Sequence, residues 1–284
     1  VNNNNVELWE ELREEALAEV NVETDVKVEG KAVITGAGDS YAAGLALAGS
    51  LPGSVRVVDP LTAATSHFDE SIIVAVSVSG RTARVIDAVK FQKSRGKRVI
   101  VVTANESSEL VNLADETLIL PFKGRPGVPG ALTYLESLVA LYRLFDLKLD
   151  DGKQVTRFDL KEGTAFLGCG PGRGNAYFAQ LKLAETFGWW SLSENLELFA
   201  HSPMFVRSLG NIIIFSCGSP LEEELERRFD DVTVVRGSAL DQARSIILSL
   251  SNKVRSLGLQ RPYFLNDKNL LEKSSYIIYD YHLS

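Results

Sequence analysis

The sequence predicts an α/β protein made of parallel sheets with helices on both faces. Short runs rich in Val and Ile alternate with amphipathic runs along the chain. The expected strands are apolar throughout, which indicates sheets that are covered on both sides. The order strand, glycine turn, small-residue helix, strand and helix occurs twice. Two copies of a doubly wound domain therefore fit the pattern better than one large sheet.

The first half opens with KAVITGAG at 31–38, a strand that runs into a glycine turn, and a helix of small residues at 40–51. Val- and Ile-rich runs predict four more strands, at 55–60, 71–80, 97–104 and 117–122. Amphipathic runs predict helices at 82–96, 108–115 and 130–147.

The segment 146–154 is polar and contains a glycine, so it is the best candidate for a linker. We therefore expect one domain over residues 1–150 and a second over 151–284, which includes the C-terminal tail. The second half repeats the plan with strands at 164–170, 211–218 and 231–237 and helices at 175–187, 220–229 and 239–258.

Composition excludes several classes of protein. The chain has 284 residues, 45% of them hydrophobic and 24% charged, which is typical of a globular protein. Its net charge of -7, with no basic block, argues against nucleic-acid binding. No apolar run has the roughly 20 residues needed to cross a membrane, and the N-terminus does not resemble a secretory signal.

The chain has two cysteines and three histidines, too few for a disulfide framework, a four-cysteine zinc site or a histidine-rich metal site. Cys169 and Cys217 each lie in an apolar stretch. This usage predicts a reducing, cytoplasmic environment.

Two loops follow expected strands and precede expected helices, where free backbone N–H groups attract anions. In GAGDSYAAG at 36–44, Gly38 and Ser40 could cradle a ligand, although a structural turn is an equally good interpretation. This loop lacks the third glycine of the dinucleotide fingerprint, which argues against a nicotinamide cofactor.

The loop SVSGRTA at 77–83 carries a stronger signal. Ser77, Ser79 and Thr82 place three hydroxyls beside Gly80 at a helix start, a combination that suits a phosphate dianion. A simple helix cap would need only one of these hydroxyls. Arg81 adds a cation, which could also be an ordinary surface residue.

These two loops, together with ANESSELVNLAD at 104–115, resemble the sugar isomerase (SIS) domain family in its two-domain form. SVSGRTA is similar to the family's SxSGxT phosphate-binding signature. The resemblance implies two SIS domains, each a flavodoxin-like parallel sheet flanked by helices. The phosphate site would be formed by Ser77, Ser79, Gly80, Thr82, Gly38 and Ser40.

The second half is similar to the isomerase part of glucosamine-6-phosphate synthase, through FLGCGPGRGNAYFAQLKLAE at 166–185 and NDKNLLEKSS at 266–275. The resemblance gives Glu185 the role of the base that moves a proton between C1 and C2. His201 would assist ring opening in the partner subunit's site, which implies a homodimer. Lys273 would contact the open-chain sugar or form an imine with it.

Some positions depart from this pattern. Ser202 stands where the family has Gly after the histidine, and SCGSPLEE at 216–223 has lost the SxSGxT pattern, so phosphate binding is expected only in the first domain. RPGVPGALTYLESL at 125–138 is more similar to bifunctional phosphoglucose/phosphomannose isomerases. We find no glutaminase domain, and so expect no glutamine-dependent synthesis.

The resemblance predicts an aldose–ketose isomerase, or an aminosugar-phosphate isomerase or deaminase, that acts on a hexose 6-phosphate without a metal or redox cofactor. Trp189 and Trp190 would raise the pKa of the base, Glu185, if they buried it. The alternative is a non-catalytic sugar-phosphate sensor. Such a sensor would not need Glu185, His201 and Lys273 together.

Overall fold

The computed structural model describes residues 6–152 and 154–283. Contacts between Cα atoms divide the chain into two compact units. One, here the first-sheet unit, comprises Val20–Lys123, Thr133–Leu149 and the segment from Lys268 onward. The other, the second-sheet unit, comprises the segment that ends at Glu19, Gly124–Leu132 and Asp150–Asp267.

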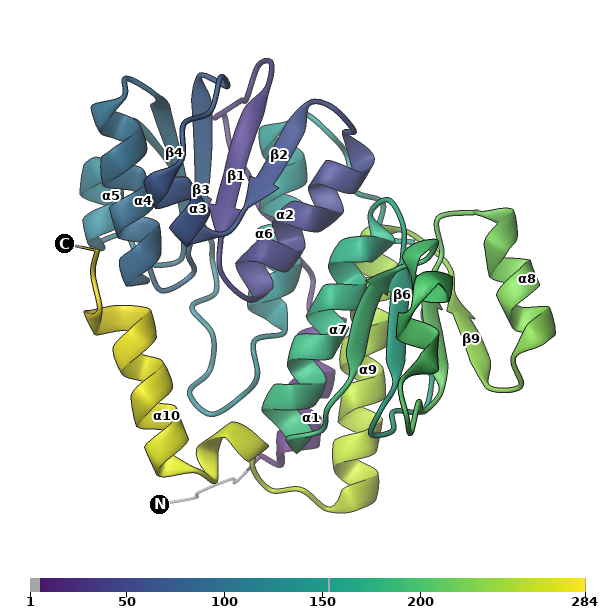
Figure 1. Cartoon of the computed structure of the whole chain (residues 1–284). Helices are drawn as coiled ribbons and strands as arrows, with labels where there is room; N and C mark the ends of the chain where they lie inside the picture. The colour runs from purple at the N-terminus through teal and green to yellow at the C-terminus, as the bar shows by residue number, and fades with distance from the viewer. Residues whose placement is uncertain (1–5, 153, 284) are drawn as a thin grey trace. The chain divides into compact units, whose positions relative to one another are not determined.

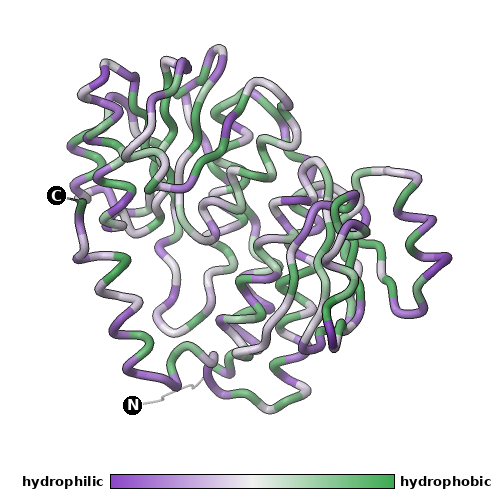
Figure 2. Tube along the Cα trace, in the orientation of Figure 1, coloured by the Kyte–Doolittle hydropathy of each residue, from purple (hydrophilic) through white to green (hydrophobic). Residues whose placement is uncertain are grey.

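The first-sheet unit contains a five-stranded parallel sheet in the order β2-β1-β3-β4-β5 (Figure 1). Its strands, in chain order, are β1 (Ala32–Gly36), β2 (Val55–Val58), β3 (Ile72–Val76), β4 (Arg98–Thr103) and β5 (Glu116–Ile119). All residues of β1 and β3 are buried, and the strands of this sheet are marked by hydrophobic residues in Figure 2. A parallel sheet covered on both faces is confirmed.

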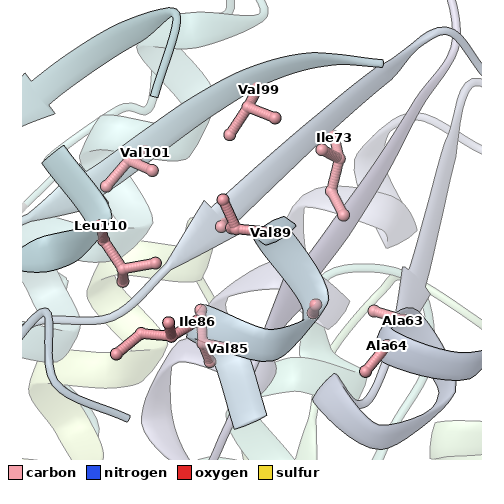
Figure 3. Packing of buried hydrophobic residues seen from close by; sticks show 11 residues of the cluster. Ala63, Ala64, Ile73, Val85, Ile86, Val89, Val99, Val101 and Leu110 are labelled. Atoms are coloured by element: carbon pink, nitrogen blue, oxygen red, sulfur yellow. The ribbon is translucent and has the colours of Figure 1, made fainter. Parts of the chain in front are cut away.

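Helices cover both faces of this sheet. They are α2 (Asp39–Ser50), α3 (Pro60–Thr65), α4 (Ala83–Ser94), α5 (Glu109–Leu113) and α6 (Leu132–Leu144). On one face, Val85 and Ile86 of α4 pack with Ile73 and Val101 of the sheet and with Leu110 of α5 (Figure 3). On the other face, α2 approaches closely at Gly44, where an added Cβ would lie 3.1 Å from Val57 and 3.2 Å from Ile34.

The second-sheet unit contains a four-stranded parallel sheet in the order β7-β6-β8-β9. Its strands are β6 (Ala165–Gly168), β7 (Leu192–Asn195), β8 (Ile212–Phe215) and β9 (Val232–Val235). We did not predict β7, because LSEN lacks the run of Val and Ile that marks the other strands. The helices are α1 (Leu8–Leu17), α7 (Gly172–Phe187), α8 (Pro220–Arg228) and α9 (Ala239–Leu257).

The division of the chain differs from a simple cut at residue 150. Side chains of α9 hold the N-terminal segment: Arg244 donates to the backbone carbonyls of Ala16 and Ala18, the latter at 2.9 Å, and to the Asp151 carboxylate at 2.9 Å. The Arg244 side chain is only 5% exposed and the Asp151 side chain 32%, so these bonds are largely shielded from solvent on the arginine side. The N-terminal helix therefore belongs to the second-sheet unit.

The C-terminal tail belongs to the first-sheet unit. It contains α10 (Lys268–Ser275) and a short π-helix, Tyr276–Asp280. The carboxylate of Asp87 on α4 lies 2.8 Å from Nδ1 of His282 and accepts a hydrogen bond from the Leu283 amide at 2.9 Å. Arg84 donates to the Tyr281 carbonyl. These bonds tie the tail to the helix that follows the SVSGRTA loop.

A disulfide joins Cys169, after β6, to Cys217, after β8, with their Cα atoms 5.8 Å apart. We did not anticipate this bridge, because the sequence shows only that each cysteine follows an apolar run. In the part of the chain that the structure describes, no helix is long and apolar enough to cross a membrane.

Candidate functional site

The candidate site lies in the loop 77–82, which connects β3 to α4. The strand ends at Val76, earlier than the predicted residue 80, so the whole SVSG segment is free to form a loop. Ser77 is buried, and its hydroxyl lies 3.1 Å from that of Thr82. The Ser79 hydroxyl accepts a hydrogen bond from the Arg81 amide at 3.3 Å. The loop therefore gathers all three predicted hydroxyls at the start of a helix.

A simpler interpretation of this loop is that Thr82 only caps the helix. Thr82 is the N-cap residue of α4, yet within the described chain its side chain makes no capping bond to the helix. Its hydroxyl faces Ser77 instead. The first N–H groups of a helix have no partner inside the helix. They remain suited to an anion at this end of α4.

Gly80 allows the loop to turn close to its neighbours. Its φ of +63° is in the left-handed region, and a Cβ here would lie 2.4 Å from Cβ and Oγ of Ser108 and 3.0 Å from Oγ1 of Thr103. No side chain fits at this point without displacing the next loop. The glycine of the motif is thus required by both backbone conformation and close approach.

Residues at the end of β4 and just after it support the loop. Two of them lie in the segment 104–115 that resembles the SIS family, although none was predicted to be a site residue. Asn105 donates from Nδ2 to the Ser79 carbonyl at 3.0 Å, and Thr103 donates to the Val78 carbonyl at 3.2 Å. Ser108 is buried, and its hydroxyl has no hydrogen-bond partner among the described residues. A buried hydroxyl without a partner costs free energy, so Ser108 is a further candidate ligand contact. Its signal in the sequence is its place after β4, at the same sheet edge.

The glycine loop after β1 is a neighbour of the phosphate loop. Gly36 pairs with Val76 in the sheet, so the two loops leave adjacent strands at the same edge. An added Cβ at Gly36 would lie 2.8 Å from Cβ of Ser40, so the turn is tight. Gly38 has a φ of +56°, and Ser40 is buried on the first turn of α2. All six predicted phosphate-site residues therefore lie on two adjacent loops or on the first turn of the helix that follows.

A buried tyrosine lies near this edge. Tyr134 of α6 is fully buried, and burial, followed by the nearby Asp39 carboxylate, raises the pKa of its hydroxyl well above the usual value. The hydroxyl therefore stays protonated and neutral at physiological pH. Asp39 is the first residue of α2, directly after the glycine loop.

Arg81 is exposed, and its guanidinium lies 5.4 Å from the centre of the Tyr279 ring in the C-terminal tail. This distance is within the range of a cation–π contact. Lys273 is exposed on α10 of the same tail.

Glu185 and His201 lie in the second-sheet unit. The Glu185 carboxylate is 2.6 Å from the ammonium of Lys182, one turn earlier on α7, and its side chain is 37% exposed. Lys182 is almost completely buried, with its ammonium 5.3 Å from the Phe178 ring centre. Sequence reasoning missed Lys182, although the three-residue spacing to Glu185 places both on one helix face.

The sequence left open whether Trp189 and Trp190 bury Glu185, and in the structure the Glu185 side chain is 37% exposed. Trp189 stacks on Phe187, with ring centres 4.5 Å apart, and Glu185 is paired with an ammonium group. His201 ends a short 3₁₀ helix, Leu198–His201, where its side chain is 71% exposed and lies 3.8 Å from the Glu197 carboxylate. Phe205, a few residues later, is 77% exposed.

The second sheet has an equivalent loop after β8, but its own glutamate fills it. Glu222 is buried and accepts hydrogen bonds from the amides of Cys217 at 2.8 Å and Ser219 at 3.1 Å. Its other oxygen accepts from the Ser216 hydroxyl at 2.6 Å. A phosphate at this loop would need the same donors. Donor atoms of Cys169, Cys217 and Glu222 lie within 4.8 Å of one another, but the sulfurs are bonded to each other and so provide no thiolate for a metal.

Comparison with known families identifies the segment that forms most of the first-sheet unit. Residues 26–146 match the model of the SIS domain. This segment contains both loops of the candidate site. Residues 26–146 form a SIS domain.

Curated relatives match through part of the chain. A glutamine–fructose-6-phosphate aminotransferase (isomerizing) from Aeropyrum pernix is 33% identical over 145 residues, which is 49% of this chain and 24% of that protein. A protein of the same name from Pyrobaculum aerophilum is 32% identical over 39% of this chain and 20% of that protein. The matched segment thus spans about a quarter or less of these relatives.

Solved structures match the fold of nearly the whole chain. Glucosamine-6-phosphate deaminase from Thermotoga maritima aligns with a TM-score of 0.67 at 18% identity, over 90% of this chain and 95% of that one. Tagatose-6-phosphate ketose/aldose isomerase from Escherichia coli aligns with a TM-score of 0.60 at 15% identity, over 79% and 82%. At this identity the likeness establishes the fold alone.

Proposed function

We propose that the chain is a sugar-phosphate enzyme, an aldose–ketose isomerase or an aminosugar-phosphate isomerase or deaminase that acts on a hexose 6-phosphate. The observation that carries this proposal is the loop of Ser77, Ser79 and Thr82 at the start of α4, with Gly80 in the left-handed region. Hydroxyls and free amides at a helix start suit a phosphate dianion. The names of the relatives are consistent with such a substrate.

The second-sheet unit is proposed to be a second SIS domain that supplies catalytic groups. Its strand order β7-β6-β8-β9 repeats the order β2-β1-β3-β4 of the first sheet. It carries Glu185 next to Lys182. A carboxylate in this position can serve as the base of a proton transfer.

In the proposed reaction, Glu185 takes the proton from C2 of the open-chain sugar and returns it to C1. The intermediate is a cis-enediol for a hydroxy sugar and an enolamine for an aminosugar. His201 assists ring opening, and Lys273 contacts the open chain. The exposed His201 and Phe205 favour a homodimer in which this segment completes the partner's site. No step requires a metal or a redox cofactor.

Glu185→Gln tests the catalytic proposal. The change keeps the size of the side chain but removes its basicity, and a base contributes roughly 10²–10⁴-fold to rate. Turnover of the hexose 6-phosphate or aminosugar phosphate that the parent accepts should fall at least about a hundredfold, with little change in affinity. Glu109→Gln is the matched control, because Glu109 is also paired with a lysine, Lys90, but on the protein surface.

Ser79→Ala tests the phosphate site. Loss of a charge-assisted hydrogen bond should weaken phosphate-ester binding about tenfold or more in calorimetry. Ser94→Ala, at an exposed helix serine, is the control. Unchanged affinity would remove the loop from the proposal.

The alternative is a non-catalytic sugar-phosphate sensor. It would be favoured if several sugar phosphates bind to the parent protein and none is turned over. If the parent is active and Glu185→Gln keeps the full rate, another residue is the base.

A further inference from the structure

The disulfide closes the carboxyl edge of the second sheet. Gly168 and Phe215 form the last residue pair between β6 and β8. Cys169 follows Gly168 directly, Cys217 lies two residues after Phe215, and the two cysteines are covalently joined with 5.8 Å between their Cα atoms. The bridge therefore links the loop that begins α7 to the loop that begins α8.

The two cysteine residues differ in their exposure to solvent. Cys217 is exposed, whereas Cys169 is half-buried. Thiol–disulfide exchange requires a thiolate to reach one sulfur of the bridge. Attack is therefore expected at Cys217, the more exposed residue, and it makes the sulfur of Cys169 the leaving group.

Two neighbouring groups have opposite effects on negative charge at these sulfurs. Cys169 precedes the start of α7, and the amide of Gly172 donates to its carbonyl at 3.0 Å. The positive end of a helix favours a thiolate leaving group. The Glu222 carboxylate lies within 4.8 Å of both sulfurs and opposes negative charge there. Exchange at this bridge is therefore favoured by the helix and slowed by the glutamate.

The bridged Cys169 lies three residues before the first residue of α7. A Cβ on Gly172 would lie 2.3 Å from the carbonyl oxygen of Phe215, so the first residue of the helix packs directly on the end of β8. The Arg173 side chain donates to the Ser193 hydroxyl of β7 at 2.6 Å. The helix that begins here also carries Lys182 and Glu185. Opening the bridge would loosen the loop that fixes the start of this helix.

We propose that Cys169–Cys217 is a thiol-exchange site, a reversible bridge that a dithiol reductant opens and that thereby sets the mobility of the loop before α7. One thiolate of the reductant attacks the Cys217 sulfur, the S–S bond breaks, and the Cys169 sulfur leaves as a thiolate. The second thiol of the reductant then displaces Cys217 from the mixed disulfide. The reductant becomes a cyclic disulfide, and both cysteines take up protons from water.

The test uses the whole protein, prepared without reductant and then equilibrated with dithiothreitol under native conditions. Alkylation followed by mass spectrometry should find no free thiol before reduction and both cysteines modified afterwards. Hydrogen exchange of residues 169–175 and 216–222 should become at least about fivefold faster on reduction. The loops 36–40 and 77–82 of the first sheet have no cysteine, so their exchange should stay constant and serve as the internal control.

Variants separate the bridge from other effects of the reductant. The double variant Cys169→Ser, Cys217→Ser should show the fast loop exchange without reductant and no response to it. In the single variants, Cys217 should be alkylated faster than Cys169, because only Cys217 is exposed.

Three results would overturn the proposal. The bridge would be purely structural if it resists dithiothreitol until the protein unfolds. There would be no bridge to exchange if both thiols stay free after treatment with oxidised glutathione. The loop would not depend on the bridge if its hydrogen exchange is unchanged on reduction.

Discussion

Replacement of Gly80 by alanine tests whether the phosphate loop depends on close approach or only on a left-handed residue. At Gly80 an added Cβ would lie 2.4 Å from Cβ and Oγ of Ser108. Gly96 is the matched control. Its φ of +74° is similar to the +63° of Gly80, but no atom lies within 4 Å of an added Cβ.

The two substitutions should differ in cost. Gly96→Ala carries only the strain of a left-handed alanine, about 1 kcal/mol. Gly80→Ala adds overpacking against Ser108, typically about 1–3 kcal/mol, for a total of about 2–4 kcal/mol. At about 2–4 °C per kcal/mol, the melting temperature should fall by about 2–4 °C for Gly96→Ala and by about 4–16 °C for Gly80→Ala.

Thermal unfolding followed by circular dichroism measures both changes. Ser108→Gly removes the atoms in the way, so adding it to Gly80→Ala should recover much of the loss, with a coupling of about 1 kcal/mol or more. Equal shifts for the two alanine variants would refute the close-approach argument. So would a double variant whose cost is simply the sum of its parts.

Three further predictions concern stability. Asp115→Asn should lower the free energy of unfolding by about 0.5–1 kcal/mol at neutral pH, because the half-exposed carboxylate accepts a hydrogen bond from the Val99 amide. That bond holds the pKa of the Asp115 carboxyl below its usual 3.8, so the difference from the parent should shrink only as pH falls below about 3.8. Burial raises the pKa of the Glu15 carboxyl above its usual 4.5, so its stabilising contribution is lost as pH rises through the raised value. Glu15→Gln keeps an oxygen for the Leu132 amide and should therefore gain stability relative to the parent as pH rises above about 4.5; a constant difference in urea unfolding would contradict this. Arg244→Met should cost about 2–4 kcal/mol in the same assay, because it removes the partner of the buried Ala16 carbonyl and of the partly buried Ala18 carbonyl and Asp151 carboxylate.

The sequence was sufficient for much of the fold because its strands are apolar on both faces. The runs at 71–80 and 97–104 predict β3 and β4, although β3 ends at Val76, where the hydroxyl-rich loop begins. The polar strand β7 was not predictable from its own residues, since its pairing with β6 defines it. The helix α1 gave no sign that Arg244, far along the chain, would hold it.

The site was predictable where its residues are close in sequence. Ser77, Ser79 and Thr82 lie on one short loop, so the motif already implies their proximity. The contact of Gly80 with Ser108 depends on how neighbouring strands pair, which a single sequence does not show. The Cys169–Cys217 bridge was missed for the same reason.

The carboxylate of Glu222 has a consequence for the number of ligands the protein can hold. Its oxygens already accept from the Cys217 and Ser219 amides and the Ser216 hydroxyl. The second loop thus carries an internal competitor, which a dissolved anion would have to displace from these donors. An inhibitor that contains a phosphate mimic should therefore bind at the loop 77–82 and not at the loop after β8. Although the chain contains two similar sheets, it should bind one phosphate group and not two.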